Sequence, residues 1–469
     1  MNYKKILLLL VAFLMLQPII DILTTASIFL VDTNLTVGVL IRAAYMLALL
    51  AFLLWVARKS KISRIFTVYL IGLAVLIGIN IVINYQVKDP YYLFQELKFF
   101  NKVIYFHIVL LGLMVVYKEL KARNFDISTK TTKYFWISGM VIGIIFIIAQ
   151  LTGTSLSNYS YNKTGFTGWF YAGNEIGAIM AIILPIMALY GVEKTDSWKK
   201  PWAWIPFLLL SIGMLALGTK VGYGGILIVL LSVFIGSLIM LMMKKRTPTV
   251  RANLLVSFTL TALLIIVTPF TPVFGNMFAH IENLGINFGE PAERPGDEVP
   301  QEGEEGYVEE PTGITNEQMQ NLVFSSREVY AEHMQDDFNS SPLVQQLFGM
   351  GFAGNYEEPQ PGKAPTMIEM DFHDWFYSFG WIGFLYLMLP FVWFAGKYLI
   401  HFVRNLKTHF TYFYILYGVA FLLGVGIAYT AGHVLTAPAV SIYLAAILAM
   451  LTVKENLIPI NNTQSASDS

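Results

Sequence analysis

Long runs of apolar residues alternate with short polar connectors along most of the chain. Runs of about 17–25 apolar residues are the pattern of a helix that spans a lipid bilayer. About twelve such runs predict spans near residues 6–30, 36–57, 65–85, 101–117, 134–152, 172–192, 202–218, 221–243, 253–273, 373–396, 411–430 and 434–452. Only a few residues around Gly218 and Lys220 separate the seventh run from the eighth. The pattern therefore predicts an all-α polytopic membrane protein.

One long polar interruption separates the ninth predicted span from the tenth. It divides the chain into nine spans (1–273), a large loop (274–372), three further spans (373–453) and a tail (454–469). Within the loop, residues 290–312 are acidic, rich in Pro and Gly, and nearly free of large apolar side chains. Such a composition cannot bury a core, so this segment is predicted to be disordered.

The second half of the loop has a helical pattern. Thr315-Asn-Glu-Gln318 fits a capping box, and apolar residues then recur at helical spacing up to Met334. Arg327 lies four residues after Val323 and three before Tyr330, so it is predicted on or beside the apolar stripe of this helix. A guanidinium that faces a packed or membrane-facing side requires an anionic partner.

Basic residues gather in every second connector. The set comprises Lys4, Lys5, the Lys and Arg residues of 58–64, 118–133, 194–200, 244–251 and 397–407, and Lys454. The exceptions are fewer, namely Lys88, Lys98, Lys102 and Lys163. Because cytoplasmic connectors carry the excess of Lys and Arg, the alternation predicts that both termini are cytoplasmic and that the large loop is extracytoplasmic.

Composition agrees with a membrane protein and excludes several other classes. Apolar residues make up 56% of the 469 residues, charged residues 13%, and the mean hydropathy is +0.59, whereas a soluble domain averages roughly 25% charged residues. The formal net charge of zero argues against a nucleic acid partner. The chain contains no cysteine, which excludes disulfides, thiolate nucleophiles and cysteine metal sites.

Several polar side chains fall at or near the predicted outer ends of the spans. They come from five separate parts of the chain and comprise Asn174, Glu175, Lys220, Arg327, His373 and His433. Chance can place polar residues at span ends, but it does not favour one side of the membrane. The set therefore predicts a site where the large loop meets the outer surface.

His373 stands where the large loop meets the tenth span, and two interpretations remain open. It is either an interfacial polar residue or a base or hydrogen-bond donor at the membrane surface, for which imidazole is suited. A metal site is not expected, because His333 and His373 are far apart in sequence and the chain has no HExxH pair.

Other polar residues also have structural explanations. Lys220 is either a snorkelling anchor or a headgroup ligand, and Asn174 fits the N-cap of a helix. Asp21 and His107 lie inside predicted spans and are interpreted as helix-packing or kink residues. Lys102 belongs to an aromatic and basic segment that is predicted to touch lipid phosphates.

A glycine motif in the loop has the form of a nucleotide fingerprint. Gly349-Met-Gly351-Phe-Ala-Gly354 matches GxGxxG, but a dinucleotide site needs a preceding strand and a following helix. The segment is loop-like and predicted to be extracytoplasmic. We therefore interpret its glycines as tight turns near a close-packed site.

Several segments, taken in order, resemble one family. They are Gly168 to Glu175, Thr219-Lys-Val-Gly-Tyr-Gly224, Ser326-Arg327, Pro342 to Gly351, and His373-Asp-x5-Gly380-x2-Gly383. In this order and spacing, residues 160–450 resemble the O-antigen ligase and O-antigen polymerase superfamily of bacterial membrane glycosyltransferases. The resemblance implies a GT-C-like helical fold with one large extracytoplasmic loop that contains short helices.

The resemblance also implies an activity. It implies transfer of polyprenyl-diphosphate-linked glycans to a glycan or lipid acceptor outside the cytoplasmic membrane, without nucleotide sugar, metal or other cofactor. His373 and Arg327 take the implied catalytic roles, with His373 orienting or deprotonating the attacking hydroxyl. The residues implied to bind the diphosphate or glycan are Lys220, Asn174, Glu175, Tyr223, Asp374 and His433. Asp374 replaces the family's common Asn and either orients His373 or caps the tenth span.

The residue types suit this chemistry independently. Arginine makes bidentate contacts to phosphate, and lysine acts as a point charge. A departing diphosphate needs positive charge but no proton, so one base suffices where hydrolases use two carboxylates.

Two alternatives belong to other functional classes. One is a twelve-helix transporter or flippase for lipid-linked oligosaccharide, although such proteins often have two similar halves and polar sites at the midplane. The other is a scaffold subunit of a polysaccharide assembly complex. The expected partners are membrane lipids, the lipid-linked donor, the acceptor and other polysaccharide-assembly proteins.

Overall fold

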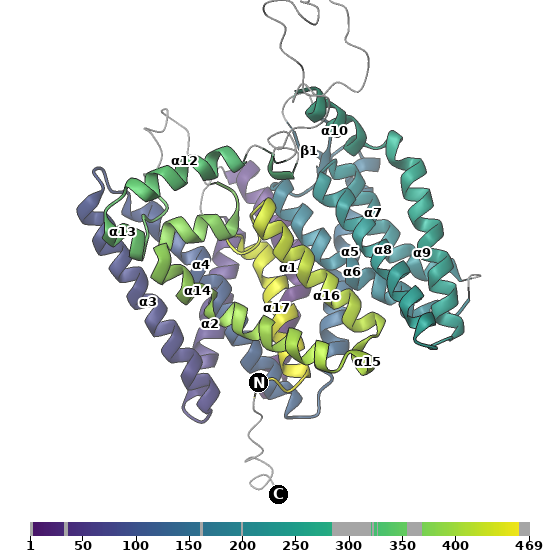
Figure 1. The fold of residues 1–469 in the computed structure, drawn as a ribbon, viewed down its shortest axis with the longest axis horizontal. Helices are drawn as coiled ribbons and strands as arrows, with labels where there is room; N and C mark the ends of the chain where they lie inside the picture. The colour runs from purple at the N-terminus through teal and green to yellow at the C-terminus, as the bar shows by residue number, and fades with distance from the viewer. Residues whose placement is uncertain are drawn as a thin grey trace, which may run out of the picture.

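The chain folds into a bundle of long helices with short helices lying across one face (Figure 1). The computed structural model describes residues 3–31, 36–159, 163–197, 200–283, 320, 323–325, 327–353 and 368–458. The elements are α1 (Tyr3–Val31), α2 (Val37–Ala57), α3 (Lys61–Val87), α4 (Leu93–Lys121), α5 (Ile127–Leu151), β1 (Leu156–Ser157), β2 (Phe166–Gly168), α6 (Gly173–Lys194), η1 (Pro201–Trp204), α7 (Ile205–Leu217), α8 (Lys220–Met242), α9 (Pro248–Val267), η2 (Thr268–Phe270), α10 (Pro272–Asn283), α12 (Arg327–Ser340), α13 (Leu343–Phe348), α14 (Asp371–Arg404), α15 (Leu406–His409), α16 (Tyr412–Thr430) and α17 (Pro438–Lys454).

The predicted all-α polytopic architecture is confirmed. Among the described residues, ten helices are long and apolar enough to span a membrane, and two shorter apolar helices cover Trp202–Leu217 and Pro438–Lys454. Together they coincide with the apolar runs of the sequence. Gly218 ends α7 in the left-handed conformation at φ 74°, and the Thr219 side chain caps α8, so the short break between these two helices is present.

The helices α4, α6 and α17 form the centre of the bundle. Of the most apolar 18-residue stretch of each helix, 89% is buried in α6 and 78% in α4, against 28% in α3 and in α9. In α17 every residue from Ala439 to Val453 is buried. Small residues in these helices, such as Ala181 and Ala445, are fully buried, and small side chains permit close approach of neighbouring helices. The outer helices α3 and α9 expose apolar side chains, as a lipid-facing position requires.

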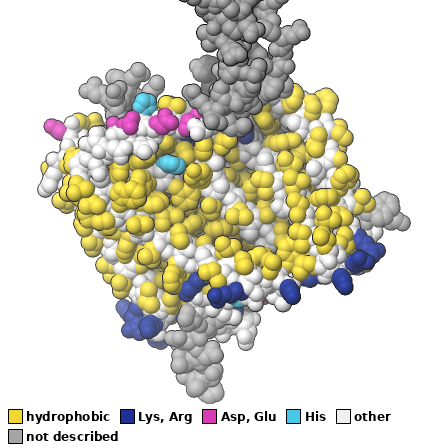
Figure 2. Space-filling view, in the orientation of Figure 1, with side chains coloured by type: hydrophobic (Ala, Val, Ile, Leu, Met, Phe, Trp, Pro, Cys, Tyr) yellow, Lys and Arg dark blue, Asp and Glu magenta, His cyan; other side chains and the backbone are white. Residues whose placement is uncertain are grey.

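The bundle has two unlike faces. Figure 2 shows Lys and Arg gathered along one edge of a broad apolar surface, and Asp and Glu along the opposite edge, where α12 lies. We call the first the basic face and the second, which carries α10, α12 and α13, the loop face. The alternation of basic connectors along the sequence therefore corresponds to one face of the molecule.

The helix α14 differs from the single continuous span predicted at residues 373–396. Gly380 breaks it with φ 66° and ψ −174°, and a Cβ at this position would lie 2.5 Å from the carbonyl oxygen of Gln346. The segment before the break carries His373, and the longer segment after it reaches Arg404. The end of α13 packs into the break, so the two loop helices and the span form one unit.

Buried hydrogen bonds fasten these elements to their neighbours. Asn80 in α3 donates to the carbonyl oxygens of Phe348, at 2.7 Å, and Ser378, at 2.9 Å. His107 in α4 lies 3.0 Å from the carbonyl oxygen of Leu387 in α14. The interpretation of His107 as a helix-packing residue is therefore confirmed.

Two parts of the connectors depart from the sequence prediction or lie beyond it. A short antiparallel pair, β1 with β2, joins α5 to α6 and was not predicted, because strands of two and three residues carry no periodicity. The predicted capping box at 315–318 and the acidic segment 290–312 lie outside the described residues.

Candidate active site

The predicted site residues lie at the loop face on the ends of several helices. Asn174 and Glu175 belong to the first turn of α6, Lys220 and Tyr223 to the first turn of α8, Arg327 to the start of α12, His373 and Asp374 to the first turn of α14, and His433 to the connection between α16 and α17. Their contacts decide which of them act together.

Glu369 joins two of the predicted cations. Its Oε2 atom accepts a hydrogen bond from Nη2 of Arg327 at 2.7 Å, and its Oε1 atom lies 3.5 Å from Nε2 of His433. Arg327 also donates to the carbonyl oxygen of Phe324 at 3.3 Å. Glu369 is thus the anionic partner expected for Arg327, although no sequence pattern singled it out. We call Arg327, Glu369 and His433 the ion triad.

The contacts within the ion triad shift the pKa values of Glu369 and His433. The hydrogen bond from His433, and then the charges of His433 and Arg327, lower the pKa of Glu369 to about 2 although burial opposes them. Burial disfavours the charged form of His433, but the hydrogen bond to Glu369 and the negative charges around the imidazole raise its pKa. Both shifts favour the same arrangement, a carboxylate between a guanidinium and an imidazolium.

Close backbone packing positions the ion triad. Glu369 and His433 have φ values of 63° and 60°, which non-glycine residues rarely adopt. Between them, a Cβ at Gly432 would lie 2.3 Å from the carbonyl oxygen of Glu369. Backbone strain of this kind persists only where the surrounding structure enforces it.

The buried carboxylate of Asp371 supplies that support. It accepts hydrogen bonds from the backbone N–H groups of residues 434–436 at 2.8–3.4 Å and from the hydroxyl of Thr436 at 2.5 Å. The turn that carries His433 is thereby tied to the start of α14, two residues before His373.

His373 lies close to this group through an aromatic contact. Its ring is 5.8 Å from the ring of Tyr429, which is 6.1 Å from the ring of Phe324, the residue that accepts from Arg327. The Nδ1 atom of His373 is buried and has no hydrogen-bond partner among the described residues. A buried polar atom without a partner costs about 1–3 kcal/mol, which favours a working side chain over a merely interfacial one.

Asp374 caps α14 and does not orient His373. Its carboxylate accepts hydrogen bonds from the backbone N–H groups of Ile368 and Met370, both at 3.1 Å. Met370 is the N-cap residue and its own side chain makes no cap. Of the two alternatives left open by the sequence, capping is the one present. Asp374 is also buried, so it offers no exposed carboxylate to a substrate.

Lys220 approaches the same region from α8. Its Nζ atom is 3.4 Å from Oγ of Ser325, two residues before Arg327. The charges of Lys163 and Arg327 are close enough to act on that of Lys220. Cations that are far apart in the sequence therefore converge at the loop face.

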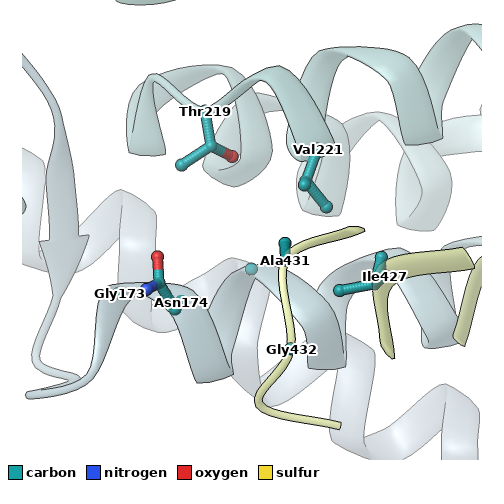
Figure 3. A pocket seen from close by; sticks show the side chains of 8 residues that line it. Gly173, Asn174, Thr219, Val221, Ile427, Ala431 and Gly432 are labelled. Atoms are coloured by element: carbon teal, nitrogen blue, oxygen red, sulfur yellow. The ribbon is translucent and has the colours of Figure 1, made fainter. Parts of the chain in front are cut away.

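A small cleft of about 50 Å³ opens between the starts of α6 and α8 and the end of α16 (Figure 3). It is lined by Gly173, Asn174, Gly177, Thr219, Val221, Ile427, Ala431 and Gly432. In Figure 3 the side chains of Asn174 and Thr219 point toward one another from the two helix starts. Helix N-termini present backbone N–H groups and a positive dipole end, so the cleft favours an anion.

Asn174 does not cap α6, contrary to the sequence interpretation. The N-cap residue is Ala172, and the helix begins at Gly173. A Cβ at Gly173 would lie 1.8 Å from Oδ1 of Asn158, so close packing against the α5–α6 connector decides where the helix starts. Asn174 is therefore the second helical residue, and its side chain is exposed at the cleft.

Glu175 links the loop face to a charged pair inside the bundle. Its charge interacts with those of Arg42 and His433. Arg42 in α2 forms an ion pair with Asp21 in α1. Lys102, predicted to touch lipid phosphates, is half-buried and also interacts with the charge of Glu175. The sequence reasoning overlooked Arg42, although an arginine inside a predicted span is itself a signal.

Tyr223 has a different neighbour from the other candidates. Its hydroxyl accepts a hydrogen bond from Thr268 at 3.0 Å, which joins α8 to the end of α9. Among the described residues, no hydrogen bond or ion pair connects Tyr223 with the ion triad. Tyr223 lies three residues after Lys220 in the first turn of α8, and this is its connection with the candidate site.

The glycine segment makes tight turns in a close-packed region, as predicted, and it packs on α4. Gly351 has φ 68°, and a Cβ there would lie 2.3 Å from Oε1 of Glu96. The buried Glu96 accepts from the backbone N–H groups of Phe352 and Ala353 at 2.9 and 3.1 Å, and Lys88 donates to the carbonyl oxygen of Ala353 at 2.6 Å. Burial lowers the pKa of Lys88 to about 8. Gly354 lies outside the described residues.

The loop face thus combines positively charged side chains, two helix starts and the half-buried imidazole of His373. These features suit the binding of a polyanion beside a group that can accept a proton. Among the described residues, no three His, Asp or Glu side chains of this face lie close enough together to hold a metal ion.

Comparison with known proteins identifies one family. A family model described as O-antigen ligase like membrane protein matches residues 2–457, which is nearly the whole chain. No curated protein matches the chain.

Proposed function

The chain belongs to the O-antigen ligase-like family of membrane proteins, and we propose that it is a glycosyltransferase of cell-surface polysaccharide assembly. In this proposal it polymerises or ligates glycans carried on a polyprenyl diphosphate. The observation that supports it most is the convergence of Arg327, Lys220 and His433 at the face where α6 and α8 begin.

In the proposal, the loop face lies outside the cytoplasmic membrane. Lys and Arg side chains gather along the basic face (Figure 2), and such residues are enriched on the cytoplasmic side. Both termini are then cytoplasmic. Because nucleotide sugars are absent outside the cytoplasm, the donor has to bring its own activated leaving group, and a lipid diphosphate provides one.

Arg327 and Lys220 hold the leaving diphosphate in this mechanism. The side chain of Arg327 is 17% exposed, and Glu369 orients its guanidinium. The Nε atom of Arg327 is buried and has no hydrogen-bond partner among the described residues, so the guanidinium retains donor capacity. Lys220 adds a point charge, and the starts of α6 and α8 add backbone N–H groups. Together they stabilise the charge that develops on the diphosphate.

His373 activates the acceptor in this mechanism. The acceptor hydroxyl oxygen forms a bond to the anomeric carbon of the donor while the bond from that carbon to the diphosphate oxygen breaks. The electron pair leaves with the diphosphate, and the hydroxyl proton passes to His373. Because Nδ1 is buried, Nε2 is the ring nitrogen left to face the acceptor. No second acid is needed, since diphosphate leaves without protonation.

A transporter or flippase is the second candidate, and one observation favours it. Asp21 and Arg42 form an ion pair within the spans α1 and α2, and charged groups inside spans often mark a substrate path. Formation of a glycosidic bond distinguishes the two functions, because a transporter moves the donor without forming one.

Substitution in cells tests the proposal. We expect Arg327→Ala and His373→Ala each to reduce the amount of polymer or ligated glycan about 100-fold or more. A donor that stabilises developing charge contributes about 10²–10³, and a positioned base about 10²–10⁴. Arg251→Ala is the matched control, because Arg251 is exposed at the start of α9 on the basic face. Unchanged polymer length and amount in the first two variants, at normal protein levels, would refute the enzymatic proposal.

A further inference from the structure

Three side chains of metal-ligating type meet on the basic face, remote from the candidate active site. His401 lies near the end of α14, His409 ends α15, and Glu455 follows α17. Oε2 of Glu455 is 3.2 Å from Nε2 of His401 and 3.0 Å from Nε2 of His409. The three candidate ligand atoms all lie within 4.8 Å of one another.

These separations fit a tetrahedral zinc ion. Zinc bonds to imidazole nitrogen and carboxylate oxygen measure about 2.0–2.2 Å, so two ligand atoms at tetrahedral angles are about 3.3 Å apart. The two distances from Glu455 are close to that value before any adjustment. Two imidazoles and one carboxylate also form a ligand set that zinc commonly takes, with water in the fourth position.

The surroundings orient the ligands as they do in metal sites. Tyr414 donates to Oε1 of Glu455 at 2.6 Å, which leaves Oε2 toward the two imidazoles. Nδ1 of His409 is 3.2 Å from the carbonyl oxygen of Asn405, an acceptor that favours a proton on Nδ1. In that tautomer Nε2 presents a lone pair to the carboxylate of Glu455. The lone pair of Nε2 and the negatively charged carboxylate repel one another. Either a cation between these two groups or a second proton on the imidazole makes their contact favourable.

Nearby charges do not block the site. Two cations, Lys121 and Lys454, interact with the charge of Glu455. The ammonium group of Lys121 is held by the carbonyl oxygens of Val453 and Lys454 at 2.7 and 2.5 Å. The ligand side chains of His401, His409 and Glu455 are only 29%, 15% and 10% exposed, so an ion has an approach but would be mostly shielded from water.

We propose that His401, His409 and Glu455 bind one zinc ion. The ion would join the end of α14, the short helix α15 and the end of α17, and through Tyr414 the start of α16. The ion therefore cross-links these helix ends on the basic face. The site is separate from the ion triad, and its role is structural.

Metal titration of the full chain tests the proposal. The protein is purified without a polyhistidine tag, treated with a chelator, placed in nanodiscs and titrated with Zn²⁺ by calorimetry. We expect one Zn²⁺ per chain, loss of binding in His409→Gln and Glu455→Gln, and about 10–100-fold weaker binding in Tyr414→Phe. His333→Gln is the matched control, because His333 is exposed on α12 at the loop face, and it should bind as the wild type does.

A second measurement on the wild type keeps the test independent of folding in the variants. X-ray absorption of the zinc-loaded protein should report two imidazole nitrogens among nitrogen and oxygen ligands. A wild-type chain that takes up no Zn²⁺, binding that persists in His409→Gln, or a spectrum without imidazole ligands would each overturn the proposal. The first outcome would mean that protonated imidazoles alone pair with Glu455.

Discussion

Glu369 is the residue on which the geometry of the candidate site depends most. It connects Arg327 from the large loop with His433 from the last connector, and it lies two residues before Asp371, which anchors the turn of His433. Removing its charge would leave two cations near one another without a counterion. A carboxylate here also keeps the guanidinium in one orientation when no substrate is bound.

The first prediction concerns the titration of His433. Replacing Glu369 with Gln should lower the pKa of His433, because the hydrogen bond and the charge that raise it are both lost. Histidine-labelled NMR in nanodiscs measures this, with His433→Gln identifying the signal and His333 serving as the exposed reference. An unchanged pKa in Glu369→Gln would show that the carboxylate does not hold the imidazolium.

The same shifts give the sign of the pH dependence of stability. The depressed pKa of Glu369 stabilises the fold above its reference value of 4.5, and that contribution is lost as pH falls toward about 2. The raised pKa of His433 stabilises the fold below its reference value of 6.5, and that contribution is lost as pH rises through the folded-state value. The pair is therefore most stabilising between about pH 4.5 and 6.5. Since 42% of the Glu369 side chain is exposed, we expect the effect to be below about 1 kcal/mol.

At this scale the sequence predicted the cations and the imidazoles but not their partners. Arg327 and His373 stand out because polar residues at the ends of apolar runs are conspicuous. Glu369 and Asp371 do not, since their partners lie about 40 to 65 residues away in the chain and no spacing rule relates them. The contacts exist only once α14 and α17 are packed.

At the scale of elements, the break in α14 sets the position of His373. Gly380 allows the helix to change direction, and the end of α13 fills the space that a side chain there would need. The short first segment is held by Asp374 at its start and by Asn80 near its end. His373 is thus presented on a rigid support at the loop face.

A matched pair of glycine substitutions tests this support. In Gly380→Ala the positive φ and the contact at 2.5 Å both oppose a methyl group, so we expect a loss of about 2–5 kcal/mol. In Gly396→Ala, on the same helix with open space around the Cβ position, the change should stay within about 1 kcal/mol. Thermal unfolding in detergent compares the two. Equal melting temperatures would contradict the role assigned to Gly380.

Apolar runs predicted the spans well, whereas the helix ends depended on packing. The start of α8 could be predicted because Gly218 is a residue type that ends helices, here α7, and Thr219 is one that caps them, here α8. The start of α6 was misplaced, because Gly173 packs against Asn158 and moves the N-cap to Ala172. Such a contact leaves no periodic trace in the sequence.

At the scale of the whole molecule, the order of helices from centre to lipid was beyond sequence reasoning. Lipid is as apolar as a protein interior. The central helices α4 and α6 therefore have a mean hydropathy similar to that of α3 and α9 at the edge. Small residues in α6 and α17 were the available hint. The two faces, in contrast, follow directly from the basic connectors (Figure 2).

The proposed orientation leads to a labelling prediction. Since the chain has no cysteine, single cysteines can be introduced at His333, exposed on the loop face, and at Lys59, exposed on the basic face. A membrane-impermeant maleimide added to intact cells should label the first and not the second. The reverse pattern would place the candidate site in the cytoplasm, where a lipid-linked donor is no longer required.

The most direct test of the central claim is a purified reaction. The wild-type chain in nanodiscs is supplied with a polyprenyl-diphosphate-linked glycan and an acceptor, and both the released polyprenyl diphosphate and the new glycosidic bond are quantified. For the wild type and for Arg251→Ala, we predict that the two products form in equal amounts. For Arg327→Ala, we predict a rate that is lower by about 100-fold or more. Absence of glycosidic bond formation by the wild type, or an undiminished rate in Arg327→Ala, would contradict it.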